Sequence, residues 1–135
     1  MYRVDSLITM TTDIADRADC ERLVRAFYER AFEDDRLGPI FVDVARLDLD
    51  THVPRITSFW ETVLLGARSY GGGAFVPHYE LDQQTPLTAD LFDRWVSLWT
   101  TTVDELFAGP VADDAKRRAR LVASAFAQRL AQLRG

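Results

Sequence analysis

The chain has 135 residues, of which 47% are hydrophobic and 27% are charged, and this composition is typical of one globular domain. The formal net charge of −5 at pH 7 argues against a nucleic-acid partner, because binding to a phosphate backbone needs a basic face. The single cysteine, Cys20, excludes an intrachain disulfide and a thiolate-rich metal site.

Two further classes of protein are disfavoured by the apolar pattern. No apolar run approaches the roughly 20 residues that a membrane-spanning helix needs. Residues 1–10 include Arg3 and Asp5 and lack a continuous apolar stretch, so they do not have the pattern of a signal peptide. We therefore expect a cytoplasmic protein without a membrane partner, folded as a single domain over residues 1–135.

Apolar residues at helical spacing predict a first long helix followed by a break. The helix begins at Asp16 or Asp19 and ends at Asp34, before the Gly38–Pro39 pair, which disfavours helix. A short segment at 40–41 and an irregular stretch over 42–49 come next. The inner stripe of the helix consists of Cys20, Leu23, Val24, Phe27 and Ala31.

The second helix is predicted to begin at Asp50 or Thr51, with Pro54 in its first turn, where a missing N–H costs nothing. Its apolar face consists of His52, Ile56, Phe59, Val63 and Ala67, with Trp60 and Leu64 widening it. Tyr70 and the three glycines that follow it predict a flexible loop.

The rest of the chain predicts a short apolar segment and two more long helices. The short segment covers residues 75–81 and contains His78, and a loop follows at 83–86. The third long helix begins at Thr88 and carries Trp95 on its inner side, and Gly109–Pro110 ends it. The last helix begins at about Asp113. No stretch alternates as a half-buried strand would, so the predicted class is all-α.

The chain has only two histidines, which narrows the question of a metal ligand. His78 lies between two loops among apolar residues, so one ring nitrogen can face an apolar cavity while the other donates to a backbone carbonyl. Haem iron is commonly held by one such histidine. Taken alone, His78 is better explained as a core or surface histidine without a ligand, and the same holds for His52 at the start of its helix. Zinc is disfavoured because no suitably spaced partners accompany them.

Several features in order resemble the truncated globins, most closely their third group. They are Phe27–Tyr28, the run Leu37-Gly38-Pro39-Ile40-Phe41, His52 through Ile56 to Phe59–Trp60, then His78, and finally Phe92 with Trp95. They cover roughly residues 14–130. Residues 1–13 fall outside the resemblance and have no assigned role. The resemblance implies a truncated globin fold, in which helices form a sandwich around a haem pocket.

The resemblance also implies a role for each matching residue. His78 matches the proximal iron ligand, and Tyr28, Trp95 and His52 match the polar residues of the distal pocket, on the opposite side of the haem. Phe41 matches a phenylalanine that packs on the haem face. Ile56, Phe59 and Trp60 match apolar walls, and Arg55 matches a basic position near a haem propionate.

The function implied is a haem b protein that binds dioxygen and other diatomic gases at an open sixth iron position. Hydrogen-bond donors in the distal pocket favour slow oxygen release and redox chemistry on bound oxygen species. One alternative is an enzyme, either a nitric oxide dioxygenase or a peroxidase-like protein, that works with a reductase partner. A haem-free helical interaction domain is the other alternative.

Overall fold

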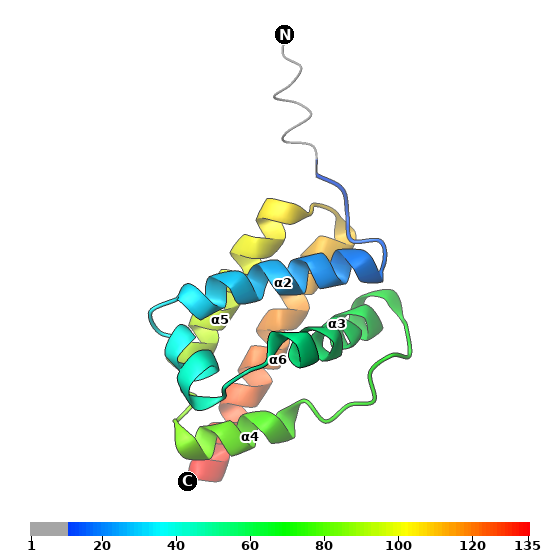
Figure 1. Ribbon diagram of the computed structural model, residues 1–135. Coiled ribbons are helices and arrows are strands. Elements are labelled where there is room, and N and C mark those ends of the chain that lie inside the picture. Colours follow the sequence, from blue (N-terminus) through cyan, green and yellow to red (C-terminus); the bar gives the residue numbers. More distant parts are fainter. Residues whose placement is uncertain (1–10) are drawn as a thin grey trace.

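The computed structural model describes residues 11–135, and this part of the chain is helical (Figure 1). Residues 1–10, most of the segment to which the sequence assigns no role, lie outside it. The four long helices are α2 (Arg17–Glu33), α3 (Leu49–Leu65), α5 (Ala89–Leu106) and α6 (Pro110–Arg134). A π-helical turn, η1 (Ile40–Val44), and the short helix α4 (Phe75–Gln84) lie between them. Four long helices with short helical pieces between them match the prediction.

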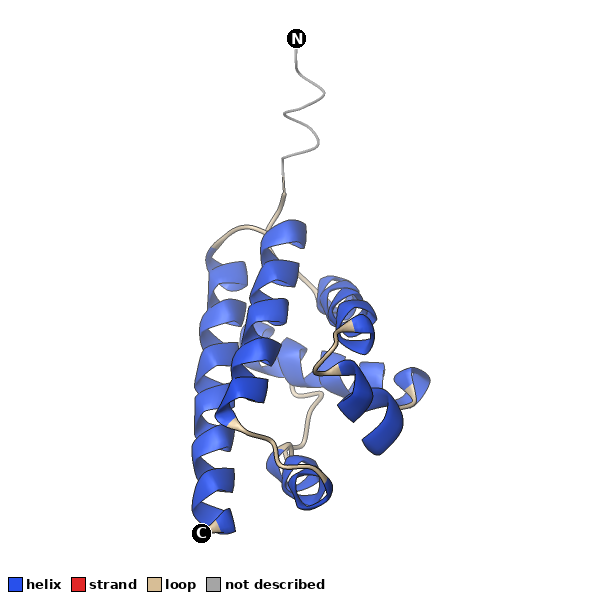
Figure 2. Cartoon of the chain, turned by 90° about the vertical axis from the view of Figure 1, so that its left-hand side faces the viewer, coloured by secondary structure: helices blue, strands red, loops and turns tan. Residues whose placement is uncertain are grey.

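The long helices form two layers. Helices α5 and α6 run side by side in opposite directions, and α2 and α3 cover them (Figures 1 and 2). Helix α4 lies across the C-terminal half of α6. No helix within residues 11–135 is long and apolar enough to cross a membrane.

Aromatic side chains fill the space between the two layers. Phe27, Trp60 and Trp99 are almost completely buried, and the rings of Trp60 and Trp99 stack with centroids 4.5 Å apart. The stripe predicted for α2 is buried throughout, and its helix begins after Asp16, whose carboxylate accepts the backbone N–H of Asp19 at 3.0 Å. The layers are therefore joined by a continuous apolar core.

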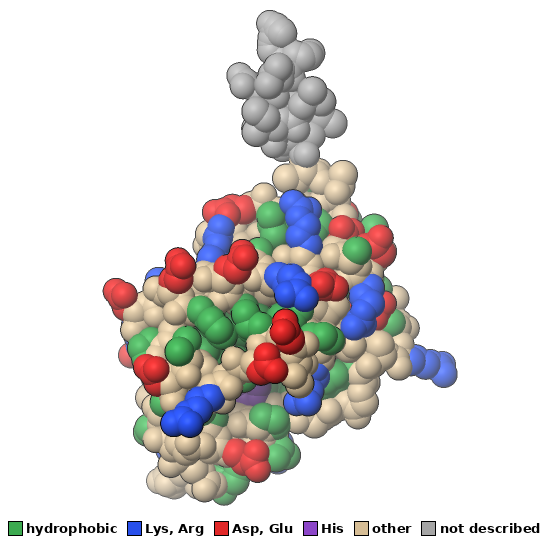
Figure 3. All heavy atoms as spheres, viewed as in Figure 1, with side chains coloured by type: hydrophobic (Ala, Val, Ile, Leu, Met, Phe, Trp, Pro, Cys, Tyr) green, Lys and Arg blue, Asp and Glu red, His purple; other side chains and the backbone are tan. Residues whose placement is uncertain are grey.

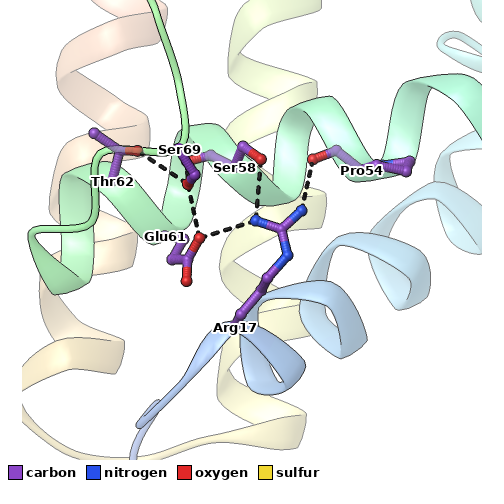
Figure 4. Close-up of polar contacts among 6 residues, drawn as sticks. All are labelled: Arg17, Pro54, Ser58, Glu61, Thr62 and Ser69. Carbon is purple, nitrogen blue, oxygen red and sulfur yellow. Dashed lines mark hydrogen bonds and ion pairs between the residues drawn. The ribbon is translucent and has the colours of Figure 1, made fainter.

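A polar cluster fastens α3 to the start of α2 (Figure 4). The Arg17 guanidinium donates to the Ser58 hydroxyl at 3.0 Å, to the Glu61 carboxylate at 2.9 Å and to the Pro54 carbonyl at 3.3 Å. Ser69, just beyond α3, donates to the same Glu61 oxygen at 2.7 Å. The loop that follows α3 is thereby held close to both helices at its beginning.

Helix α3 begins earlier than predicted. Its cap is Asp48, whose carboxylate accepts the backbone N–H of Asp50 and the hydroxyl of Thr51, so neither Asp50 nor Thr51 is the cap. Pro54 consequently lies inside the helix, beyond the first turn, where its missing N–H removes one helical hydrogen bond.

Three other predictions about local structure were wrong. Residues 42–44 belong to η1 and are not irregular. Residues 83–84, predicted to begin a loop, are the last turn of α4. Ala67 is not part of the apolar face of α3, because the helix ends at Leu65 and Gly66 adopts a left-handed φ of 75° that stops it.

Helix α6 begins at Pro110 and not at about Asp113. Proline is suited to the first helical position because its N–H would have no partner there. The next two backbone N–H groups, those of Val111 and Ala112, donate to the Asp13 carboxylate at 2.9 and 2.8 Å. The cap of this helix thus comes from a residue far away in the sequence.

Candidate functional site

A cavity of about 390 Å³ lies among η1 and the helices α2, α3, α4, α5 and α6. This volume is in the usual range for small-molecule sites. Figure 3 shows a hollow in the face that α3 and α4 share, with a histidine side chain at its base. The predicted site residues in its wall are Tyr28, Phe41, His52, Ile56, Phe59, Trp60, His78 and Trp95.

Helix α3 has two apolar faces, and they differ in burial. Val53, Thr57 and Trp60 are buried on the side of the core. Ile56 and Phe59 are only half-buried and face the cavity. The apolar surface of α3 therefore extends from the buried core side to half-buried residues that line the cavity.

His78 projects from α4 into this cavity with one nitrogen already engaged. Its Nδ1 donates to the backbone carbonyl of Ala74 at 2.7 Å, as the sequence predicted, because a carbonyl can only accept. The neutral ring then carries its lone pair on Nε2, which has no hydrogen-bond partner among residues 11–135. Burial lowers the pKa of His78, which favours this neutral form. A neutral imidazole with a free Nε2 is a suitable metal ligand.

Tyr28 and His52 are linked on another wall of the cavity. The Tyr28 hydroxyl lies 2.8 Å from His52 Nε2, although the residues come from α2 and α3. Burial raises the pKa of Tyr28, so it is a neutral phenol. Burial and the nearby positive charge of Arg55 lower the pKa of His52 to about 4, so His52 is neutral at pH 7.

Trp95 comes from α5 and borders the same cavity. Its ring lies parallel to that of Trp99 at 6.0 Å and meets Phe27 edge-on at 5.9 Å. The Trp99 indole N–H donates to the carbonyl of Ala115, whereas the Trp95 indole N–H has no such partner among the described residues. Trp95 therefore retains an unused donor.

Phe41 belongs to η1, and its ring meets that of Tyr28 edge-on at 5.7 Å. This contact brings the turn after α2 against the side chain that α2 presents to the cavity. The π-helical turn thus places an aromatic wall beside the Tyr28 ring.

Arg55 is the one predicted site residue that does not line the cavity. Its side chain is exposed on α3, between His52 and Ile56, and its charge acts on His52. Sequence reasoning also missed several wall residues, among them Tyr70, Leu81, Leu87, Val122 and Phe126. The last two follow the helical stripe of α6 and could have been predicted as lining residues, but a stripe does not tell a cavity wall from a core contact.

No family model matches the chain. The group 3 truncated haemoglobin ctb of Campylobacter jejuni is 26% identical over 120 residues, which are 87% of this chain and 92% of that protein. The crystal structure of a group III truncated haemoglobin from C. jejuni superposes with a TM-score of 0.79 at 26% identity, covering 90% of this chain and 95% of the other. The chain is therefore homologous to a group III truncated haemoglobin over about 90% of its length. It has the all-α truncated globin fold of that protein, which confirms the predicted resemblance and fold.

This homology to a truncated haemoglobin implies a haem cofactor and diatomic gases as ligands. The residues present fit such a cofactor. The cavity wall is mostly apolar, and the free Nε2 of His78 is a ready axial donor. The hydroxyl and indole donors of Tyr28 and Trp95 come from other helices. A haem-free interaction domain would not require an apolar cavity, a free histidine nitrogen and hydroxyl and indole donors at one site.

Proposed function

We propose that this truncated haemoglobin binds haem b through His78 and holds a diatomic ligand, dioxygen above all, beneath Tyr28, His52 and Trp95. The site is part of a single domain, which the structure describes over residues 11–135. The observation that carries the proposal is the pairing of two features across one apolar cavity: a histidine with a free Nε2, and a buried tyrosine–histidine hydrogen bond.

His78 is the proposed iron ligand because its ring is fixed before any cofactor binds. The hydrogen bond to the Ala74 carbonyl sets both the tautomer and the orientation of the ring. Haem held by one axial histidine supplies an open coordination position for a diatomic gas. His52 is the weaker candidate for axial ligand because its Nε2 is already bonded to Tyr28.

The Tyr28–His52 bond determines which hydrogen is free for the ligand. If Tyr28 donates to His52, its only hydrogen is used. If the Nε2–H of neutral His52 donates to the Tyr28 oxygen, the phenol hydrogen is free to point into the cavity. We assign the second arrangement to the ligand-bound protein, because it gives a polar ligand a donor that His52 itself orients.

Trp95 supplies the second proposed donor. Its indole N–H is unused, and its ring is held in place by Phe27 and Trp99. Two donors in a water-poor cavity stabilise negative charge on a ligand more than they would in water. Slow release of dioxygen follows, which suits redox chemistry on oxygen species better than oxygen delivery.

The remaining site residues hold the cofactor. Phe41, Ile56, Phe59 and Trp60 provide apolar surface for the faces of the ring. Arg55 is exposed beside His52, and we assign its guanidinium to a haem propionate, since an exposed cation can pair with a carboxylate that reaches solvent.

A second candidate function is enzymatic, as a nitric oxide dioxygenase or a peroxidase-like protein in a cytoplasmic setting. The clustering of three polar side chains over an otherwise apolar cavity favours it, because such donors stabilise charge that develops during reaction. A reductase would have to supply electrons. Turnover with reductant and nitric oxide, or with peroxide, distinguishes this function from ligand binding alone.

The test of the proposal is the absorption spectrum of the purified protein in its ferric, ferrous and carbon monoxide forms. We expect a haem b spectrum, and we expect His78→Ala to abolish or greatly weaken haem retention while His52→Ala retains haem. A His78→Ala protein with an unchanged Soret band would refute His78 as the ligand. Equal loss in both variants would mean that both histidines are required.

A further inference from the structure

The helix that carries His78 depends on other elements for its position. Helix α4 has ten residues, and its N-cap Ala74 provides no side-chain cap. The segment before it, residues 66–74, has no regular secondary structure. Helices this short are marginal by themselves in water. The contacts that α4 makes with neighbouring elements, chiefly α6, therefore determine where His78 lies.

The first part of α4 is held by rings. Phe126 of α6 meets His78 at a centroid distance of 4.9 Å and Phe75 at 5.3 Å. The Arg129 guanidinium lies over the Phe75 ring at 4.0 Å. These contacts anchor one end of α4, but they do not prevent the helix from pivoting about that end.

The second part of α4 is held by a buried charge. Asp82 lies one helical turn after His78, and its side chain is only 5% exposed. Its Oδ1 accepts the backbone N–H of Leu87 at 2.8 Å and is paired with the guanidinium of Arg134, at the end of α6. A buried carboxylate without a partner is costly, so this pairing holds the two helix ends together.

We propose that Asp82, paired with Arg134, is a positioning residue for His78. The inference rests on the proposed function. The ring contacts at Phe126 fix one end of α4 and the Asp82–Arg134 pair fixes the other, so the helix cannot tilt and the Nε2 of His78 keeps a single orientation toward the cofactor. Without the pair, α4 pivots at Phe126, and the orientation of the His78 ring becomes heterogeneous.

The experiment measures the iron–histidine stretching band of the full-length ferrous protein by resonance Raman spectroscopy. Asp82→Asn removes the charge and keeps an oxygen that can accept from Leu87. Arg134→Gln removes the positively charged partner. Arg134 is half-exposed and close to the C-terminus, so we expect this substitution to disturb folding little. We expect both variants to broaden the band and shift it to lower frequency, and Arg134→Lys to restore it. The double variant should show no larger shift than either single one.

The matched control is Lys116→Gln, which removes an ion pair between α6 and Asp104 of α5, away from α4. It should leave the band unchanged. The proposal is overturned if Asp82→Asn and Arg134→Gln bind haem with the parent band, or if Lys116→Gln shifts it equally. Failure of the proposed function has a different signature, because the parent protein itself would then show no iron–histidine band.

Discussion

Tyr28 and His52 share one hydrogen bond, and this sharing decides what each side chain offers to a ligand. If Tyr28 and Trp95 both donate to bound dioxygen, removing either loses a hydrogen bond to a charged group, about 1.5–3 kcal/mol. Tyr28→Phe or Trp95→Phe should then speed oxygen dissociation by about 10- to 150-fold, since about 1.4 kcal/mol corresponds to a factor of ten. Stopped-flow measurement of dioxygen release checks this.

Carbon monoxide is the control for that experiment. It is much less polar when bound, so its dissociation should change less in the same variants. Equal changes for both gases would indicate steric opening of the cavity in place of lost hydrogen bonding. Unchanged oxygen release in both single variants and in the double variant would show that neither donor reaches the ligand.

A pH-dependent stability follows from His52. Its pKa in the folded protein is about 4, whereas an unperturbed histidine titrates near 6.5. As pH falls from about 6.5 toward 4, His52 therefore becomes protonated in the unfolded chain while it stays neutral in the folded chain. The free energy of unfolding consequently decreases over this range.

Urea unfolding of the parent and of His52→Gln at pH 7, 5 and 4 measures this contribution. We expect His52→Gln to become more stable relative to the parent as pH falls. The carboxylates are the same in both proteins, so their titration cancels in the stability difference. A difference that is constant with pH would show that His52 titrates normally.

The site residues divide into those that the sequence could predict and those that it could not. Trp95 was predicted on the inner side of its helix, and the family resemblance placed Tyr28 and His78 in the pocket; all three line the cavity. The Tyr28–His52 bond was not predicted, since it depends on how α2 and α3 cross. Arg55 lies on the same helix as the cavity wall, but it points to solvent.

At the scale of elements, the start of α6 was mispredicted because a distant contact sets it. The sequence near Asp113 contains acidic residues suited to a helix start, yet α6 begins at Pro110 because Asp13 receives its first free N–H groups. Asp13 is 98 residues from Val111 in the chain. No local sequence pattern predicts such a cap. The interiors of all four long helices, in contrast, were predictable from the spacing of apolar residues.

Asp13 should therefore contribute measurably to stability. Burial alone would raise the pKa of its carboxyl, but hydrogen bonds from the backbone N–H groups of Val111, Ala112 and Ile14 lower it. Asp13→Ala should lower the free energy of unfolding by about 0.5–2 kcal/mol, the usual loss for a helix cap. Asp13→Asn keeps an acceptor and should lose less. Chemical denaturation checks both, and equal losses would contradict the capping role.

At the scale of the whole molecule, the apolar interior is divided. The larger cluster joins α2, α3, α5 and the first half of α6. A smaller one is built on Ile40, Leu87 and Leu130, with Phe75 and Leu81 packed against it. Residues associated with both clusters line the cavity, so a cofactor bound there would join them.

Removing haem should accordingly weaken the two parts unequally. We expect the apoprotein to lose amide exchange protection in η1 and α4 before α2 and α5, because local opening starts where buried contacts are fewest. Haem at 100 times its Kd should restore about 2.7 kcal/mol of stability. Hydrogen exchange with and without haem measures this. Uniform loss of protection would show that the clusters unfold as one.

The contact between α4 and the end of α6 has a practical consequence for protein engineering. A polypeptide fused after Gly135 would emerge directly beside Arg134, next to the helix that carries His78, the proposed axial ligand. A fusion ahead of Thr12 would join the chain beside Ala108, at the other end of α6 (Figure 1). Affinity tags and reporter domains therefore belong on the N-terminal side, where their bulk cannot disturb the spectroscopic properties that an investigator intends to measure.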